Sequence, residues 1–335
     1  MKILITGASG FIGSTVADEA LARNMQVWAG MRRSSSKAYL QSRLINFVEL
    51  DLGSKSRLME QLKAHREAYG PWDYVVHCAG ATKCVHERDF YKINFEGTRN
   101  LAQALTELDM IPQRFIYLSS LSIFGPVKEQ QPYGLITDKD TPLPDTAYGK
   151  SKLMAEEFLK SLPHFPYIIL RPTGVYGPRE KDYFMMAQSI ERHFDFAIGY
   201  RPQIITFIYV KDLVKAIFLS MEKGETRRCY FISDGRGYAS RDFSDYLKRE
   251  LRVRWLIRIK APLFAAKALS LCAQEWGALW HRASTLNGDK YKIMKQRNWQ
   301  CDITPAQREL GFSPDYDLER GTREMIAWYK EEGWL

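Results

Sequence analysis

A tyrosine and a lysine four residues apart form the most reactive pair in this 335-residue sequence. Tyr148 and Lys152 are followed by a helix-forming run from Leu153 to Lys160, and a four-residue step on a helix places both side chains on one face. A phenol has an unperturbed pKa of about 10, but a nearby ammonium stabilises the phenolate and lowers that pKa. We therefore expect Tyr148 to exchange a proton with an alcohol or carbonyl group of a substrate. Ser120 follows a strand predicted at 114–119 and is placed to donate a hydrogen bond to the reacting oxygen.

A second motif opens the chain, where an apolar run at 2–5 leads into Thr6-Gly7-Ala8-Ser9-Gly10-Phe11-Ile12-Gly13 and then into a helical pattern. In this setting Gly7 makes a tight turn, Gly10 lets the backbone approach a pyrophosphate, and Gly13 lets the first helix pack close to the strand. The N–H groups at the start of that helix favour an anion. The glycine loop indicates a dinucleotide-binding site. The alternative is an ordinary tight turn between a strand and a helix, which would use glycine in the same way.

The elements that must position these groups alternate along the first half of the chain. We predict strands at 26–29, 46–50, 74–77, 114–119 and 167–171, with helices at 54–67 and 94–108. Such alternation predicts an α/β fold with a Rossmann-type doubly wound parallel sheet. After Pro172 the alternation weakens up to a final helix at 317–332, which predicts a smaller, mixed C-terminal substrate domain. We assign 1–172 to the cofactor domain and 173–335 mainly to substrate binding, with 203–220 as a segment that could return to the first domain.

Two further strand ends are expected at the carboxyl edge of the sheet, where ligands bind in such folds. Asp51 and Leu52 follow the strand at 46–50, and the Asp51 carboxylate could accept a hydrogen bond from an adenine amino group. Ala79 and Gly80 follow the strand at 74–77, and their small side chains would let a cofactor pass.

Composition excludes several other classes of function. The formal charge is +9, but basic residues are interleaved with acidic ones, so we expect an anionic small ligand rather than nucleic acid. Five cysteines without a C-x-x-C pair support neither a disulfide framework nor a metal site. The start of the chain is too short an apolar run for a signal peptide, which favours the cytoplasm. The apolar segment 255–281 is interrupted by charges, so we do not expect an integral membrane span. We expect an amphipathic helical cover over the substrate cleft, with association with a membrane surface as the weaker alternative.

The glycine loop, the strand-end serine and the Tyr148/Lys152 pair follow one another along the chain as they do in a known family. The chain resembles the extended short-chain dehydrogenases/reductases, which include nucleotide-sugar epimerases and dehydratases, dihydroflavonol reductases and 3β-hydroxysteroid dehydrogenases. The resemblance covers nearly the whole chain. The matching segments are the glycine loop, His77-Cys78-Ala79-Gly80, the run from Asn94 to Leu101, Ser119-Ser120 with Phe124-Gly125, the run from Arg171 to Pro178, and Val210-Lys211-Asp212-Leu213.

This resemblance implies roles for individual residues and a homodimer. Ser120 would polarise the substrate oxygen, Tyr148 would act as acid and base, and Lys152 would lower the pKa of Tyr148 and bind the nicotinamide ribose. Ser122 and Arg179 would contact substrate. The residues expected to bind the cofactor are Gly7, Gly10, Phe11, Ile12, Gly13, Arg32, Arg33, Asp51, Leu52, Ala79, Gly80, Asn94, Tyr148, Lys152 and Pro172.

Departures from the family pattern narrow the set of reactions and cofactors that we expect for this chain. Nucleotide-sugar dehydratases carry T-D-E where this chain has Ser120-Leu121-Ser122, so dehydration is not expected. Family members that keep NAD typically have a carboxylate at the end of the second strand, whereas this chain has Arg32 and Arg33 there. Two guanidinium groups suit the 2′-phosphate of NADP, which we expect in preference to NAD, although a solvated basic loop would look the same.

We therefore predict an NAD(P)-dependent oxidoreductase that interconverts a secondary alcohol and a ketone. A nucleotide-sugar 4-epimerase with tightly bound NAD is the alternative, and a cofactor-binding protein without turnover is disfavoured because the catalytic residues are intact. Phe184, Met185, Met186 and the segment 263–280 favour a substrate with an apolar body. Three arginines favour instead a substrate that carries a diphosphate: Arg171, Arg179 and Arg201.

Overall fold

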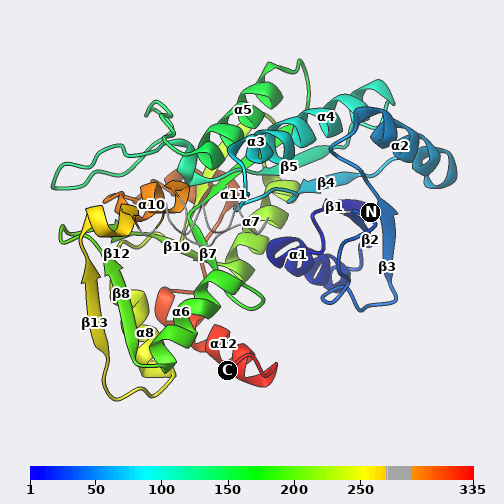
Figure 1. Cartoon of the computed structure of the whole chain (residues 1–335). Helices are drawn as coiled ribbons and strands as arrows, with labels where there is room; N and C mark the ends of the chain where they lie inside the picture. The colour runs from blue at the N-terminus through cyan, green and yellow to red at the C-terminus, as the bar shows by residue number, and fades with distance from the viewer. Residues whose placement is uncertain (269, 271–287) are drawn as a thin grey trace.

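The computed structural model describes residues 1–268, 270 and 288–335. Within this part of the chain, seven parallel strands form one sheet in the order β11-β6-β5-β4-β1-β2-β3 (Figure 1). These strands are β1 (Lys2–Thr6), β2 (Gln26–Met31), β3 (Ile45–Glu49), β4 (Tyr74–His77), β5 (Arg114–Leu118), β6 (Tyr167–Pro172) and β11 (Arg228–Ile232). The chain reverses its direction of winding between β1 and β4, so the carboxyl ends of these two strands border the crevice where such sheets bind ligands.

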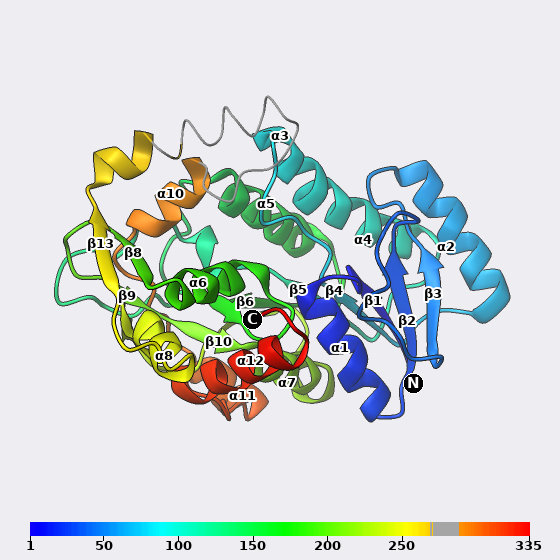
Figure 2. The same ribbon diagram turned by 60° about the horizontal axis from the view of Figure 1, so that its bottom comes forward.

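Helices cover both faces of this sheet, as the alternating sequence predicts (Figures 1 and 2). On one face α1 (Phe11–Ala22) and α7 (Val210–Lys223) share a hydrophobic core with residues of the strands. A second core lies beneath α2 (Lys55–Tyr69), α4 (Gly97–Glu107) and α5 (Ala147–Ser161) on the other face. The predicted α/β doubly wound fold is confirmed.

Part of the chain after Pro172 belongs to this sheet. Helix α7 packs beside α1, and β11 pairs in parallel with β6, from Arg228 opposite Ile168 to Ile232 opposite Pro172. The returning portion runs from 210 to 232, so it includes only the second part of the predicted segment 203–220 and extends beyond it, while 204–209 pair outside the main sheet. The assignment of the remainder to a substrate domain stays a prediction.

Most of the remaining described residues form a mixed region with its own hydrophobic core (Figure 2). Its helices are α6 (Lys181–Glu191), α8 (Asp242–Glu250), α10 (Gly288–Lys295) and α12 (Leu318–Glu331), whereas α11 (Thr304–Leu310) packs against α7 and β11 in the first hydrophobic core. Its strands pair as β7 (Gly174–Tyr176) with β10 (Phe207–Tyr209), β9 (Ile204–Ile205) with β12 (Tyr238–Ala239), and β8 (Phe194–Ile198) with β13 (Ile257–Ala261). Shorter turns precede the helices of the first region: α3 (Glu87–Phe90), the π-helix η1 (Tyr91–Glu96) and the 3₁₀ turn η2 (Leu121–Ile123).

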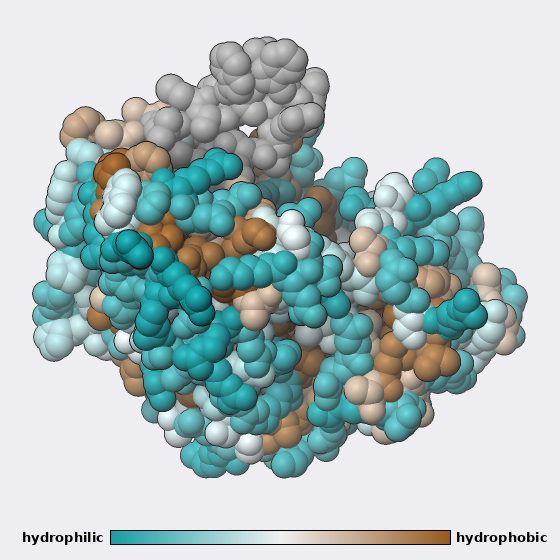
Figure 3. Space-filling view, turned by 90° about the horizontal axis from the view of Figure 1, so that it is seen from below, coloured by the Kyte–Doolittle hydropathy of each residue, from teal (hydrophilic) through white to brown (hydrophobic). Residues whose placement is uncertain are grey.

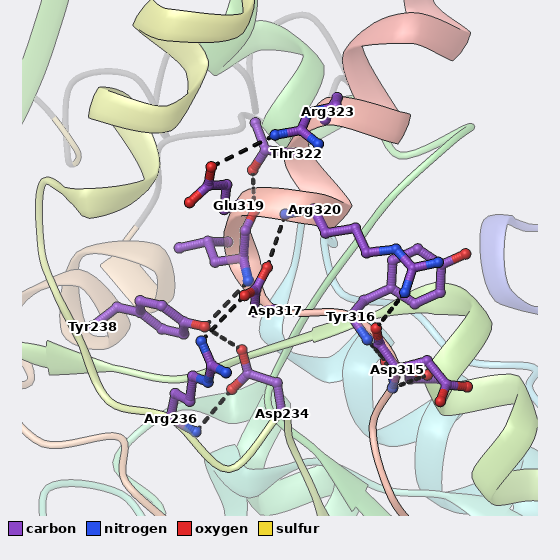
Figure 4. A network of polar contacts seen from close by, with 12 residues as sticks. Asp234, Arg236, Tyr238, Asp315, Tyr316, Asp317, Glu319, Arg320, Thr322 and Arg323 are labelled. Carbon is purple, nitrogen blue, oxygen red and sulfur yellow. Dashed lines mark hydrogen bonds and ion pairs between the residues drawn. The ribbon is translucent and has the colours of Figure 1, made fainter.

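Polar contacts fix the C-terminal helix to this region (Figure 4). The Tyr238 hydroxyl donates to Asp234 over 2.6 Å and accepts the backbone N–H of Leu318 over 3.1 Å. Asp212, from the Val210–Leu213 motif, accepts the backbone N–H groups of Asp315 and Tyr316. The aspartate of that motif therefore anchors the segment that leads into α12.

The segment 255–281 differs from the predicted helical cover at its start. Ile257 and Ile259 alternate with Arg258 and Lys260, a period of two that suits a strand, and this stretch forms β13. Residues 263–268 are helical, and the rest of the predicted cover falls at 269 and 271–287, outside the described residues. Among the described residues, no helix has the length and apolar character needed to cross a bilayer, and no group of His, Cys, Asp or Glu side chains could hold a metal ion.

Candidate active site

The glycine loop adopts a conformation that side chains would prevent. Gly7 has a φ of +66°, and a Cβ there would lie 2.7 Å from the backbone nitrogen of Ala79. A Cβ at Gly13 would overlap the Gly7 carbonyl. Helix α1 begins directly after Gly10, which offers no side-chain cap, so the first N–H groups of the helix, including those of Phe11 and Ile12, have no acceptor within the helix. These features fit a pyrophosphate at the helix N-terminus.

Two arginines directly follow β2, the strand that pairs with β1 and so ends next to the glycine loop. Arg32 and Arg33 are exposed, and neither side chain makes an ion pair within the described part of the chain. At the end of β3, Asp51 accepts the N–H of Gly53 and lies 3.5 Å from the Arg57 guanidinium. Leu52 follows, and its carbonyl accepts a hydrogen bond from an asparagine of α4. The exposed guanidinium groups fit an anionic ligand at this edge.

A buried histidine links the ends of β1 and β4 to helix α4. His77 Nδ1 lies 2.6 Å from Thr6 Oγ1, and Nε2 lies 2.9 Å from Thr98 Oγ1. Thr98 donates its hydroxyl proton to the Asn94 carbonyl, and Thr6 accepts the N–H of Ala79. One tautomer satisfies all four contacts, with the proton on Nε2. Burial, helped by the charge of Lys152, lowers the pKa of His77 to about 3, so the ring is neutral at pH 7.

Asn94 and Lys152 converge on Gly80 at the end of β4. A Cβ at Gly80 would lie 3.1 Å from both Asn94 Oδ1 and Lys152 Nζ, so a larger residue would crowd these two side chains. Asn94 lies in the π-helix η1, accepts the N–H of Ala81 and donates to Ser151. Single π-helical turns are frequent at functional sites. The Lys152 ammonium donates to the Leu118 carbonyl over 2.7 Å.

Ser120, Ser122 and Tyr148 meet between β5 and α5. Ser120 Oγ donates to Ser122 Oγ over 3.1 Å and caps η2 by accepting the Ser122 N–H. Burial raises the pKa of Tyr148 above its ordinary value, and a hydrogen bond with Ser120 lowers it in part. Burial also lowers the pKa of Lys152 to about 8, against the charge of Glu156, which raises it. The lowering of the pKa of Tyr148 by Lys152 stays a prediction.

Two arginines considered for substrate have other partners. Arg171 is buried and binds Glu156 through two hydrogen bonds of 3.0 and 2.6 Å, so it is not free to hold a diphosphate. Arg179 donates to Ser14 Oγ over 3.0 Å and pairs with Asp18 at 2.9 Å. Both partners of Arg179 lie on α1, so a substrate role would require Arg179 to leave these contacts.

The remaining predicted residues have contacts that do not by themselves indicate a role in the site. Pro172 ends β6 and pairs with Ile232 of β11. Phe184 packs against Tyr329 and Trp334 in the C-terminal core, which is the structural role that competes with a substrate role. Arg201 lines a surface pocket with Glu129 and other residues of the loop after β5.

Three features of the site escaped the sequence analysis: the histidine network, the buried Glu156–Arg171 pair, and Asp289. Asp289 lies on α10 and accepts the backbone N–H of Tyr148 over 3.1 Å. In the sequence, Asp289 is only an acidic residue in the first turn of a short helix. Its partner is 141 residues away in the chain, so the sequence gives no sign of this contact.

Comparison with known proteins identifies the family. The model of the NAD dependent epimerase/dehydratase family matches residues 3–232. Sterol-4-alpha-carboxylate 3-dehydrogenase, decarboxylating, of Dictyostelium discoideum is 24% identical over 97% of this chain and 99% of its own. A ketoreductase of 4-hydroxy-2-methyl-3-oxo-4-farnesyl-3,4-dihydroquinoline-1-oxide from Stigmatella aurantiaca is 24% identical, covering 96% of this chain and 94% of its own.

A solved structure agrees with the fold. The crystal structure of UDP-glucose 4-epimerase with UDP-glucose from Thermotoga maritima superposes with a TM-score of 0.79 at 23% identity, covering 99% of each chain. The chain belongs to the NAD-dependent epimerase/dehydratase family of extended short-chain dehydrogenases/reductases, and it is an enzyme of that family.

Proposed function

We propose that this enzyme interconverts a secondary alcohol and a ketone with NADP as its exchangeable cofactor. The observation that carries this proposal is the contact of Tyr148 with Ser120 at the carboxyl edge of the sheet, with the Lys152 ammonium beside Gly80. A hydroxyl that donates and a phenol that exchanges a proton are the groups that carbonyl reduction requires.

The bound nicotinamide would supply the acceptor or donor of hydride. The protein's own contribution is the proton: Tyr148 gives it to the carbonyl oxygen through its phenol, and Ser120 donates a hydrogen bond to the same oxygen. Because burial raises the pKa of Tyr148, the phenol holds its proton at pH 7 and can give it to a carbonyl oxygen. In the reverse direction, oxidation of the alcohol would return this proton to Tyr148.

The choice of NADP rests on Arg32 and Arg33. Their guanidinium groups are exposed at the end of β2 and have no carboxylate partner within the described ranges. A ribose 2′-phosphate would supply the charge that is missing there. An NAD-selective site would instead require an acceptor for the ribose hydroxyl groups.

We further propose that the substrate has an apolar body. Arg171 and Arg179 are bound to carboxylates, which weakens the case for a diphosphate. Two relatives are named for a sterol carboxylate and for a farnesylated quinoline ketone, and both names describe largely apolar compounds. The packing of Phe184 in the C-terminal core removes one of the residues that first suggested this substrate class.

A nucleotide-sugar 4-epimerase is the second candidate, supported by the likeness to the epimerase from Thermotoga maritima over the whole chain. It would use the same tyrosine and serine but retain NAD through both half-reactions. Native mass spectrometry of the purified protein separates the two. Release of NADP, or NADP-dependent thermal stabilisation by hydrophobic ketones, supports the reductase. Tightly retained NAD, together with stabilisation by UDP or dTDP sugars alone, would replace it with the epimerase.

A further inference from the structure

The parallel strands β8 and β13 form a ribbon whose apolar side faces solvent. Phe194 lies opposite Ile257 in the register, and Phe196 lies opposite Ile259. All four side chains are exposed, and Phe196 keeps 63% of its surface accessible. We name these four residues the ribbon face. A half-buried sheet normally places its apolar side against the core, so the orientation of this ribbon is reversed.

Charged contacts on the opposite side hold the ribbon in this orientation. Asp195 alternates with Phe194 and Phe196 and is buried. Its carboxylate accepts the Ser244 hydroxyl over 3.2 Å and lies 3.4 Å from the Arg241 guanidinium, at the start of α8. Arg258, from β13, pairs with Asp195 and with Asp245 of α8. Turning the ribbon over would bury hydrophobic residues but would break these ion pairs, so the apolar exposure is built into the fold.

Further exposed aromatic groups continue the ribbon face. Trp255, just before β13, stacks on His193 and is 56% exposed. Phe264, just after β13, is 77% exposed. Figure 3 shows hydrophobic residues on the surface at the left of the view, the side on which β8 and β13 lie in Figures 1 and 2, with hydrophilic residues beside them.

Cations flank this apolar surface. Arg192 precedes β8, Arg254 precedes β13, and Lys267 follows it; all three are exposed and make no ion pair within the described residues. The run 252–268 contains five basic residues and no acidic one. A second copy of the chain would bring the same cations against each other, so charge disfavours self-association through this surface.

We propose that the ribbon face and its flanking cations bind the surface of an anionic phospholipid bilayer. Apolar side chains that enter the interface, a tryptophan at headgroup depth and cations beside them are the features by which peripheral proteins hold such a surface. A bilayer also accepts protruding side chains such as Phe264 without a matching pocket. The proposal rests on the surface alone and does not depend on the reaction assigned to the enzyme.

Sedimentation with vesicles tests this proposal on the full chain. We expect binding to vesicles of phosphatidylcholine with phosphatidylglycerol, weaker binding to phosphatidylcholine alone, and a decrease with added salt. The variant Phe196→Ser/Phe264→Ser should bind roughly 100-fold more weakly, because each buried phenyl group contributes about a factor of ten or more. The variant Arg254→Ser/Lys267→Ser should bind roughly 25-fold more weakly, since each cation near an anionic surface contributes about a factor of five.

Matched controls remove the same kinds of side chain elsewhere. Leu44→Ser removes an exposed apolar group before β3, and Lys63→Ser removes an exposed cation on α2; both should bind vesicles as the wild type does. Thermal unfolding checks that each variant is folded. Absence of vesicle binding, or equal binding by the Phe196→Ser/Phe264→Ser variant, would overturn the proposal. So would light scattering that shows a dimer dissociated by that variant without vesicle binding by the wild type, because the face would then join two copies.

Discussion

Asp289 and Tyr148 are joined by a hydrogen bond in which the aspartate Oδ2 accepts the backbone N–H of the tyrosine over 3.1 Å. The contact lies at the N-terminus of α5, where Thr146 caps the helix by accepting the N–H of Gly149. Burial raises the pKa of Asp289, while the N–H of Tyr148 and the charge of Lys292 lower it in part. The first turn of the helix that carries the proposed acid is thus held by a residue of the C-terminal region.

The variant Asp289→Ala should lower turnover by roughly tenfold, because a small displacement of a reacting group is costly. Loss of one helix-capping acceptor should also reduce stability by about 1 kcal/mol. Asp289→Asn keeps an oxygen acceptor and is the matched control, which should retain most of the turnover. Steady-state kinetics should show the loss in kcat rather than in the KM for the cofactor. Equal kcat values for Asp289→Ala and the wild type would show that the contact does not position Tyr148.

The variant Tyr148→Phe should keep the fold and cofactor binding but lower turnover by roughly two to four orders of magnitude, the usual scale of lost acid–base catalysis. Lys152→Met should reduce both turnover and cofactor affinity, because its ammonium lies beside Gly80, where we propose that the cofactor binds. Calorimetric titration of the cofactor separates the two effects. Wild-type turnover by Tyr148→Phe on an established substrate would exclude it as the proton donor.

The sequence predicted the fold well because its signals are local. The strand at 74–77 matches β4 residue for residue, and the glycine loop lies where an apolar run precedes a helix. The positive φ of Gly7 and the blocked space at Gly13 follow from the same local geometry.

Contacts between residues far apart in the chain could not be predicted in this way. Arg171 appeared free to bind a diphosphate because its partner, Glu156, lies on a different element and gives no sequence signal. The network of His77 depends on register between β1 and β4. The strand β13 was missed because the apolar residues that follow it favoured a helix through the whole segment.

The double variant Arg32→Ala/Arg33→Ala should lose affinity for NADP while keeping that for NAD. A charge-assisted contact contributes about 1.5–3 kcal/mol, which corresponds to roughly ten- to hundredfold in affinity. Fluorescence titration of both cofactors into the wild type and the double variant measures this change. The variant Arg66→Ala, which removes an exposed arginine near the end of α2, serves as the control. If the wild type bound NADP and NAD equally, the arginines would not select the cofactor.

The buried pair of Glu156 and Arg171 should contribute to stability at neutral pH. Burial alone would raise the pKa of Glu156, but the charge and hydrogen bonds of Arg171 lower it overall. A lowered pKa stabilises the fold above the unfolded value near 4.5, and this contribution is lost as the pH falls through the folded value. Glu156→Gln should therefore cost roughly 3 kcal/mol at pH 7 and less in acid. Urea unfolding checks this, with Glu156→Leu/Arg171→Met as the variant that removes both charges and should recover part of the loss.

Asp234 should show the opposite dependence on pH. Its carboxylate is buried and accepts the Tyr238 hydroxyl (Figure 4). Burial raises the pKa of Asp234 from 3.8 to about 6, against the hydrogen bond from Tyr238. A raised pKa stabilises the fold fully below the unfolded value, and this contribution is lost as the pH rises through about 6.

The variant Asp234→Asn keeps an oxygen acceptor for Tyr238 but does not titrate. Its free energy of unfolding relative to the wild type should therefore rise by about 3 kcal/mol between pH 3 and pH 7, since one pKa unit corresponds to about 1.4 kcal/mol. Comparing the two proteins at each pH cancels the titration of the other carboxylates. Tyr238→Phe is the companion variant, because it leaves the Asp234 carboxylate with the backbone N–H of Arg236 but without the Tyr238 hydroxyl, and it should raise the pKa further. A difference between Asp234→Asn and the wild type that stays constant with pH would show that the Asp234 carboxylate titrates normally in the folded protein.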